Sequence, residues 1–302
     1  MKPPNALAAK GQVVEEWIDL HFFRPLGFAI ARRLGPTRAT PDQVTLACLV
    51  LGLLAGTLFY FPSTPLNLLG VALFVASDVL DSADGQLARM RGSSTRFGRI
   101  LDGVSDNLRF INLYLCLLLR LVHAGWGADA LVLALAAGVS HSLQSAAVDF
   151  IRQAYLYLGA GSGSELDLPE SLPLPRGGSL LRRVGAALYR DYVRKQAGLL
   201  PRTAELVRAA GPHAAESVRT EYRDRATALV PRCAWIGQNA RFALLAVTAA
   251  VGWPAGFFWI TVGPLNLILV LLVRAQESRA RALLGAAASA PAVPTPTHVR
   301  VA

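Results

Sequence analysis

Residues 81–106 read Asp81-Ser-Ala-Asp84-Gly85-Gln-Leu-Ala88-Arg89 and, after a short connection, Gly98-Arg-Ile-Leu-Asp102-Gly-Val-Ser-Asp106. These 26 residues hold four carboxylates, in a chain that is 53% hydrophobic and only 17% charged. On helices, the i, i+3 spacing of the first pair and the i, i+4 spacing of the second place each pair on one face. Carboxylates gathered in a low dielectric repel one another unless a cation neutralises them, and Mg²⁺ prefers oxygen ligands. The stretch therefore predicts a cation site between two helices.

The connection between the two pairs is rich in residues that bind phosphate. Arginine forks and small hydroxylated or glycine residues are typical of phosphate sites, because guanidinium groups and open backbone both reach phosphate oxygens. The residues concerned are Arg89, Arg91, Gly92, Ser93, Ser94, Thr95, Arg96 and Arg99. Asp78 extends the acidic register one turn upstream, either as support for the site or as an interfacial residue.

The bulk properties indicate a membrane protein of 302 residues. A chain of this length could form one or two soluble domains, but the mean hydropathy of +0.40 and the long apolar runs favour a protein that crosses a membrane several times. A formal charge of +10 fits an anionic membrane surface and phosphorylated substrates better than nucleic acid, which we do not expect as a partner. The three cysteines, Cys48, Cys116 and Cys233, are expected to be reduced packing residues, and no cleavable signal peptide is evident.

The apolar pattern predicts an all-α integral membrane fold with six transmembrane helices. The second and third helices carry the acids at one end, which must face a bundle interior or water, because a charge in lipid is costly. The predicted spans are 44–61, 66–88, 100–122, 128–150, 233–251 and 257–273.

Basic residues support this count. Lys and Arg number 6 in residues 1–43, 4 in 85–99, 13 in 152–232 and 4 from residue 274 onward, whereas the connections 62–65, 123–127 and 252–256 contain none. By the positive-inside rule, both termini and the acidic site face the cytoplasm. We therefore expect a multi-pass protein of the cytoplasmic membrane.

The segments outside the spans complete the expected organisation: 1–43 N-terminal, 44–158 spans one to four, 159–232 an insertion, 233–274 the last two spans, and 275–302 a disordered tail. Residues 12–34 are predicted to form an amphipathic helix at the membrane interface, or else an ordinary soluble one. Thr40-Pro41 marks a helix start. Residues 159–178 are expected to be a flexible linker, and 179–210 basic helices on the inner leaflet or a solvated hairpin.

The spacing D-x2-D-G-x2-A-R-x8-G-x3-D-x3-D resembles the signature of the CDP-alcohol phosphotransferase family. The resemblance implies two Mg²⁺ ions, or Mn²⁺, held by Asp81, Asp84, Asp102 and Asp106, with Asp106 also accepting the proton of the acceptor hydroxyl. It further implies that the nucleotide contacts Asp84, Gly85, Arg89 and Thr95, and that the protein is a homodimer. The expected reaction transfers a phosphoalcohol group, phosphatidyl from CDP-diacylglycerol first, from a CDP-alcohol donor to a hydroxyl acceptor with release of CMP, in phospholipid biosynthesis.

The acceptor is less defined. Arg152 matches one position of the family's basic patch for phosphorylated acceptors, but Ala154 departs from the other, which puts a glycerol-phosphate or inositol-phosphate acceptor in doubt. Arg109, Arg232 or Arg241 could supply the missing charge. Asp42 stands where many members have Asn.

Other functions stay open. A polar donor such as CDP-inositol, with an inositol phosphate or lipid acceptor, is the first alternative. A membrane prenyltransferase would need a second, distant acidic motif, and a carboxylate-lined cation transporter would need acids in the last two spans, where there are almost none. A catalytically inactive scaffold gains no support from a complete set of four aspartates.

Overall fold

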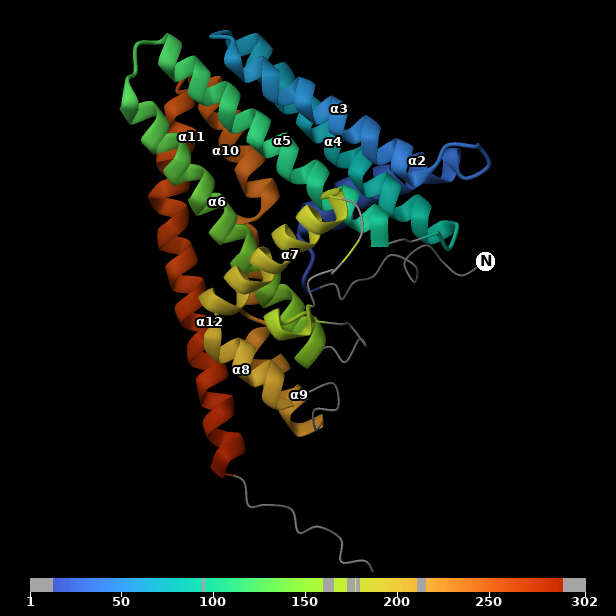
Figure 1. Cartoon of the computed structure of the whole chain (residues 1–302), viewed down its shortest axis with the longest axis vertical. Helices are drawn as coiled ribbons and strands as arrows, with labels where there is room; N and C mark the ends of the chain where they lie inside the picture. The colour runs from blue at the N-terminus through green and yellow to red at the C-terminus, as the bar shows by residue number, and fades with distance from the viewer. Residues whose placement is uncertain are drawn as a thin grey trace, which may run out of the picture.

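The computed structural model of the chain describes residues 13–93, 96–159, 166–172, 177, 180–210 and 216–289. Within these ranges every regular element is a helix (Figure 1), so the expected all-α fold is confirmed for them.

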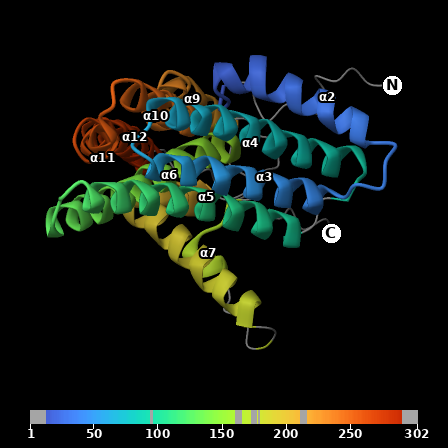
Figure 2. The ribbon, with the colours of Figure 1, turned by 90° about the horizontal axis from the view of Figure 1, so that it is seen from above.

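The N-terminal segment forms a helix that packs across the acidic motif. A π-helical turn at Asp19–Phe23 leads into α2, Arg24–Leu34, which lies beside α4 (Figure 2). A Cβ atom at Gly27 would lie 2.6 Å from the Ser82 Oγ, so glycine permits this close approach. The amide of Gln86 also donates to the Arg24 carbonyl, at 3.0 Å. These helical elements cover Asp19–Leu34 of the predicted 12–34, while the amphipathic role of the segment at a membrane interface stays a prediction.

The helix start predicted at Thr40-Pro41 is confirmed. Helix α3 runs Pro41–Thr57 and continues as a 3-10 turn, Leu58–Tyr60. The Thr40 hydroxyl accepts from the Gln43 backbone N–H at 3.3 Å, and the Gln43 side chain accepts from the Thr40 N–H at 3.0 Å. This reciprocal capping box satisfies two backbone donors that the first turn of a helix otherwise leaves unpaired.

Three long helices carry the middle of the chain: α4, Thr64–Met90; α5, Arg96–His123; and α6, Ala128–Ala154, extended by a π-helical turn at Tyr155–Gly159. Each has 27 or 28 residues, or about 40 Å at about 1.5 Å per residue. That length exceeds a hydrocarbon core of about 30 Å.

Four helical stretches of the described chain are long and apolar enough to cross a membrane: Pro41–Tyr60, Thr64–Met90, Ala128–Gly159 and Pro254–Gly285. They correspond to the first, second, fourth and sixth predicted spans. Helix α5, which contains the third predicted span, is not among them; its sequence includes Asp102, Asp106, Arg109 and Arg120. Six membrane crossings therefore remain a prediction.

The fifth predicted span, 233–251, is wrong as a single helix. The chain forms a 3-10 helix at Val230–Ile236, is extended at Gly237 with φ −75° and ψ 179°, and starts α10 afresh at Gln238–Ala250. The extended glycine interrupts the helical hydrogen-bond ladder. Helix α10 has only 13 residues, so it is roughly 20 Å long.

The last predicted span is longer than expected and is interrupted. Helix α11, Pro254–Val262, is followed by Gly263 and then by α12, Pro264–Ser289. Proline lacks the N–H that would continue the ladder, which explains the break between the two helices. The expectation of a disordered tail from residue 275 is wrong as far as Ser289, because α12 is helical to that point. Residues 290–302 lie outside the described chain.

The insertion packs partly on the bundle. After a 3-10 turn at Pro169–Ser171 come α7, Leu180–Leu199; α8, Pro201–Ala210; and α9, Glu216–Ala226. Helix α7 projects from the bundle in Figure 2, whereas α8 and α9 lie along α12. Most of the predicted flexible linker, residues 160–165, 173–176 and 178, lies outside the described chain.

The three connections without basic residues lie at one end of the bundle. The rings of Tyr60 and His123 meet edge to face with centroids 5.5 Å apart, which joins the α3–α4 and α5–α6 connections. A small enclosed pocket includes Phe59, Arg120 and Pro254 among its lining residues and so brings in the α10–α11 connection. This grouping agrees with the pattern of basic residues, although the side of the membrane that the end faces stays a prediction.

Candidate active site

A buried arginine lies at the centre of the acidic motif. The side chain of Arg109, on α5, is 2% exposed. Its Nη1 donates to Asp78 Oδ1 at 2.9 Å and to Ser77 Oγ at 2.8 Å. Its Nη2 lies 3.7 Å from Asp81 Oδ1 and donates to Asp106 Oδ1. One guanidinium group thus joins two acids of α4 to one acid of α5. Arginine suits this role because its planar group carries several N–H donors.

The sequence provides room for this arginine on the neighbouring helix. A Cβ atom at Gly52 of α3 would overlap the Cδ and Cγ atoms of Arg109. A glycine at this position therefore lets the guanidinium lie between α3, α4 and α5.

Asp78 is a structural part of the site. Its second oxygen, Oδ2, accepts from Gln238 Nε2 at 2.8 Å, so both oxygens have partners although the side chain is only 9% exposed. Buried charges persist in proteins when they are paired and hydrogen-bonded. Of the two roles left open for Asp78, the structure supports the first, because Asp78 connects α10 to Arg109.

The nucleotide-binding candidates that the structure describes lie on the last two turns of α4. Asp84 is buried and accepts a 2.5 Å hydrogen bond from the Thr45 hydroxyl of α3. Arg89 is exposed, and a Cβ atom at Gly85 would stand 3.4 Å from its guanidinium, which is ordinary contact. Thr95, the remaining candidate, lies outside the described residues.

The acids suit a hard divalent cation by their chemistry. Asp81 and Asp106 are about one third exposed, at 32% and 37%, and carboxylate oxygens are preferred ligands of Mg²⁺. Arg109 already holds a positive group between them. Asp102 is on α5, but its side chain is outside the described set. Among the side chains that are described, no three His, Cys, Asp or Glu residues are arranged to hold a metal ion. The two-metal site stays a proposal.

The four arginines proposed for the acceptor have different surroundings. Arg109 belongs to the acidic cluster, and Arg152 Nη2 donates to Glu16 Oε1 at 2.9 Å. Arg241 is buried and donates to Gln144 Oε1 at 2.7 Å and to a backbone carbonyl at 2.6 Å. Arg232 is exposed. The structure brings Arg109 to the acids but does not gather the four into one patch.

Several residues of this region escaped the sequence analysis. Thr45, Ser77, Gln238, Glu16 and Asn239 all bond to the acids or arginines just described. Uncharged residues carry no local signal of such contacts, since their partners are 32 to 223 positions away in the sequence. The sequence offers no signal that separates Glu16 from its neighbour Glu15.

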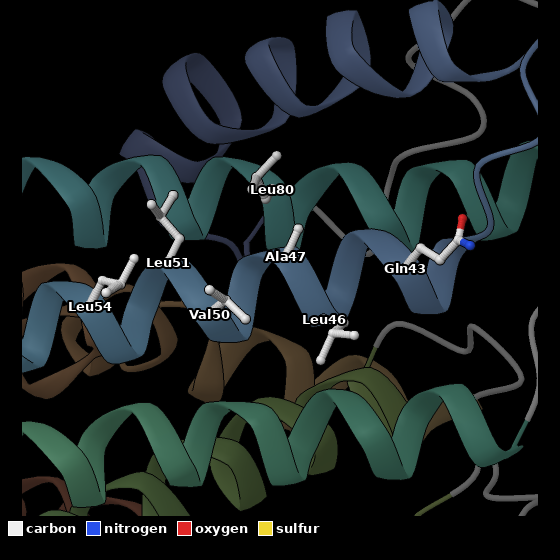
Figure 3. A pocket seen from close by; sticks show the side chains of 7 residues that line it. All are labelled: Gln43, Leu46, Ala47, Val50, Leu51, Leu54 and Leu80. Atoms are coloured by element: carbon white, nitrogen blue, oxygen red, sulfur yellow. The ribbon is translucent and has the colours of Figure 1, made fainter.

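An apolar groove opens on the outer face of α3 (Figure 3). Its volume is about 500 Å³, and it ends on Leu80, the residue before Asp81. The lining is hydrocarbon except for Gln43. It comprises Gln43, Leu46, Ala47, Val50, Leu51, Leu54 and Leu80.

Part of the chain matches known proteins. Residues 38–161 match the family model described as CDP-alcohol phosphatidyltransferase. The chain is 31% identical over 111 residues to the bifunctional IPC transferase and DIPP synthase of Aquifex aeolicus, covering 34% of this chain and 25% of that protein. It is 40% identical over 78 residues to the inner membrane protein YnbA of Escherichia coli, covering 25% of this chain and 38% of that protein. Each match therefore spans well under half of the relative.

Proposed function

Because residues 38–161 belong to the CDP-alcohol phosphatidyltransferase family, we propose that this membrane protein transfers a phosphoalcohol group from a CDP-alcohol to a hydroxyl acceptor. The observation that carries the proposal is the joining of Asp78 and Asp81 of α4 to Asp106 of α5 through Arg109. This arrangement makes one acidic surface from the two halves of the motif.

In the proposed reaction, the acceptor oxygen forms a bond to the phosphorus that carries the alcohol. The bond from that phosphorus to the CMP oxygen breaks, CMP leaves, and the hydroxyl proton passes to a carboxylate. Asp106 is the proposed acceptor of the proton, since its side chain is partly exposed and Arg109 fixes one of its oxygens. General bases of this kind must lie within hydrogen-bond reach of the hydroxyl.

Two Mg²⁺ ions, or Mn²⁺, would be held by Asp81, Asp84, Asp102 and Asp106. When bound, such ions offset the negative charge on the diphosphate and on the leaving CMP. The chain's own contribution is to orient the carboxylates, through Thr45 at Asp84 and Arg109 at Asp106. Gly85, Arg89 and Thr95 are proposed to contact the nucleotide.

The donor is proposed to be CDP-diacylglycerol, with phosphatidyl as the transferred group and a role in phospholipid biosynthesis. The apolar groove on α3, which includes Leu80 of α4 in its lining, supports a donor with hydrocarbon chains, because such chains gain free energy from leaving water. A polar donor such as CDP-inositol is the alternative, and the two donors are compared directly in the assay below. A homodimer and an active site on the cytoplasmic face, with both termini on that side, complete the proposal.

Purified protein tests this function. We expect Asp84→Asn or Asp102→Asn to abolish CMP release in Mg²⁺ while expression in the membrane is retained, because each change removes a charged ligand. The assay uses CDP-diacylglycerol and CDP-inositol with a panel of hydroxyl acceptors. Asp129→Asn is the control, since Asp129 lies in the first turn of α6, and it should keep wild-type turnover. Undiminished CMP release by either motif variant would refute the assignment.

A further inference from the structure

A carboxylate of the N-terminal segment lies in an anion-binding position next to the acidic site. Glu16 is 7% exposed. Its Oε1 accepts from Arg152 Nη2 at 2.9 Å, and its Oε2 accepts from Asn239 Nδ2 at 2.8 Å. A Cβ atom at Gly237 would overlap Oε1, so the carboxylate also lies against the backbone that begins α10.

These partners form a site that suits an anion. A guanidinium group, a side-chain amide and a helix N-terminus all favour negative charge, the last through the helix dipole and its unpaired N–H groups. Helix α10 has 13 residues, and its N-cap, Gly237, provides no side-chain cap. The Nε of Arg152 is buried and has no hydrogen-bond partner among the described residues. A phosphate group would find the same partners, but Glu16 already uses them.

The anion position is linked to the cluster around Arg109 through consecutive residues of α10. Asn239 donates to Glu16 and to Asp19 Oδ1, the latter at 2.9 Å, while its neighbour Gln238 donates to Asp78 at 2.8 Å. The same first turn of α10 therefore contacts both the N-terminal carboxylates and the cluster around Arg109.

We propose that Glu16 is a specificity-determining residue that fills this anion position, so that the acceptor is an uncharged hydroxyl compound and phosphorylated acceptors are rejected. The inference rests on the proposed transferase function. Its physical basis is charge, because Glu16 already pairs with Arg152 and Asp19 accepts from the same amide of Asn239, so a phosphate would meet two carboxylates at close range. Like charges placed together across a binding site oppose association strongly.

Direct binding of inorganic phosphate tests the anion site without any turnover. Thermal unfolding in detergent is measured with and without phosphate at constant ionic strength for the wild type, Glu16→Gln and Glu15→Gln. A ligand that binds the folded state raises the melting temperature with its concentration. We expect phosphate to stabilise Glu16→Gln alone. Glu15→Gln is the matched control, because Glu15 is also buried and paired, but with Arg24.

Acceptor preference tests the consequence for catalysis. CMP release is compared for glycerol against glycerol phosphate, and for inositol against inositol phosphate. We expect the wild type and Glu15→Gln to prefer the uncharged member of a pair. For Glu16→Gln, we expect the kcat/KM for the phosphorylated acceptor, divided by the kcat/KM for the uncharged one, to rise by about tenfold or more. A tenfold change corresponds to about 1.4 kcal/mol.

Each outcome decides the matter. If the wild type prefers phosphorylated acceptors, the inference is overturned, even where Glu16→Gln does not fold. It is also overturned if phosphate stabilises the wild type as much as it stabilises Glu16→Gln. A folded Glu16→Gln protein that gains neither phosphate binding nor a changed ratio overturns it as well. If no pair of donor and acceptor releases CMP, the proposed function is refuted, and so is the assignment of an uncharged acceptor. The phosphate experiment would still decide whether Glu16 fills an anion site.

Discussion

At the scale of residues, the site depends on one buried positive charge shared by three acids. Arg109 contacts Asp78, Asp81 and Asp106, and the second oxygen of Asp78 accepts from the side-chain amide of Gln238. Breaking a buried charge pair typically costs about 3–5 kcal/mol, because the remaining charge is left without compensation. The position of the guanidinium is therefore decisive for both stability and the geometry of the acids.

Gly52→Ala tests this position without touching an acid. The added methyl would overlap Arg109, so the guanidinium must move; we expect a loss of about 1–3 kcal/mol in stability and a clear fall in CMP release. Thermal unfolding and turnover measure the two effects. Gly138→Ala on α6 is the control, because its new Cβ would stand 3.9 Å from Tyr114 and meet only ordinary contact. If the two variants behave alike, Gly52 is not needed for the placement of Arg109.

At the scale of elements, the insertion is joined to the bundle by a carboxylate at a helix start. Glu277 of α12 accepts from the backbone N–H of Arg202 at 2.8 Å, and from the N–H and hydroxyl of Thr203, both at 2.9 Å. These donors lie in the first turn of α8, where the helix dipole also favours negative charge. Helix α8 is therefore held against α12 rather than only resting on a lipid surface.

We expect Glu277→Ala to destabilise the attachment of α8 by about 1–3 kcal/mol, because backbone donors lose a charged acceptor. Limited proteolysis should then cut within residues 180–210 faster than in the wild type. Glu205→Ala is the control: Glu205 is 51% exposed and pairs with Arg202 at the surface, where ion pairs contribute about 0–1 kcal/mol. Equal cleavage of both variants would show that Glu277 does not secure α8.

At the scale of the whole molecule, the outer faces of the long helices are apolar and exposed. Such a surface is too extensive for a soluble protein and suits contact with lipid. It includes Leu46, Val50 and Leu54 of α3; Leu131, Val132, Leu135 and Val139 of α6; and Leu267 and Leu271 of α12. The guanidinium of Arg109 and the carboxylate of Asp78, by contrast, are buried within the bundle.

Cysteine accessibility tests the orientation of this bundle. Cys48, Cys116 and Cys233 are buried and unpaired, so a background lacking them is designed first. Single cysteines at Ser93 and Ala124, both exposed, then report the two ends. We expect an impermeant reagent outside intact cells to label Ala124→Cys and to spare Ser93→Cys until the cells are opened. External labelling of Ser93→Cys would overturn the proposed topology.

The sequence predicted the helical fold, the start of α3 and the grouping of the connections, because capping residues and charge bias are local signals. It missed the break in the helix at Gly237, because the sequence stays apolar on both sides of this residue although the backbone there is extended. It also proposed Arg152 for the acceptor, with Arg109, Arg232 or Arg241 as sources of a second charge, and could not separate these three. Their partners come from distant helices, and only the fold distinguishes an arginine paired with Glu16 from one bonded to Gln144.

The brevity of α10 has a consequence for the backbone that precedes it. A helix of roughly 20 Å is too short to cross a hydrocarbon layer of about 30 Å by itself, so in the proposed topology the 3-10 segment before it would lie within that layer too. Irregular backbone at that depth is tolerated where protein buries it, and Val230, Cys233 and Ile236 of this segment are buried. The helices around the segment would thus shield from the lipid the amide groups that a continuous helix would have satisfied by itself.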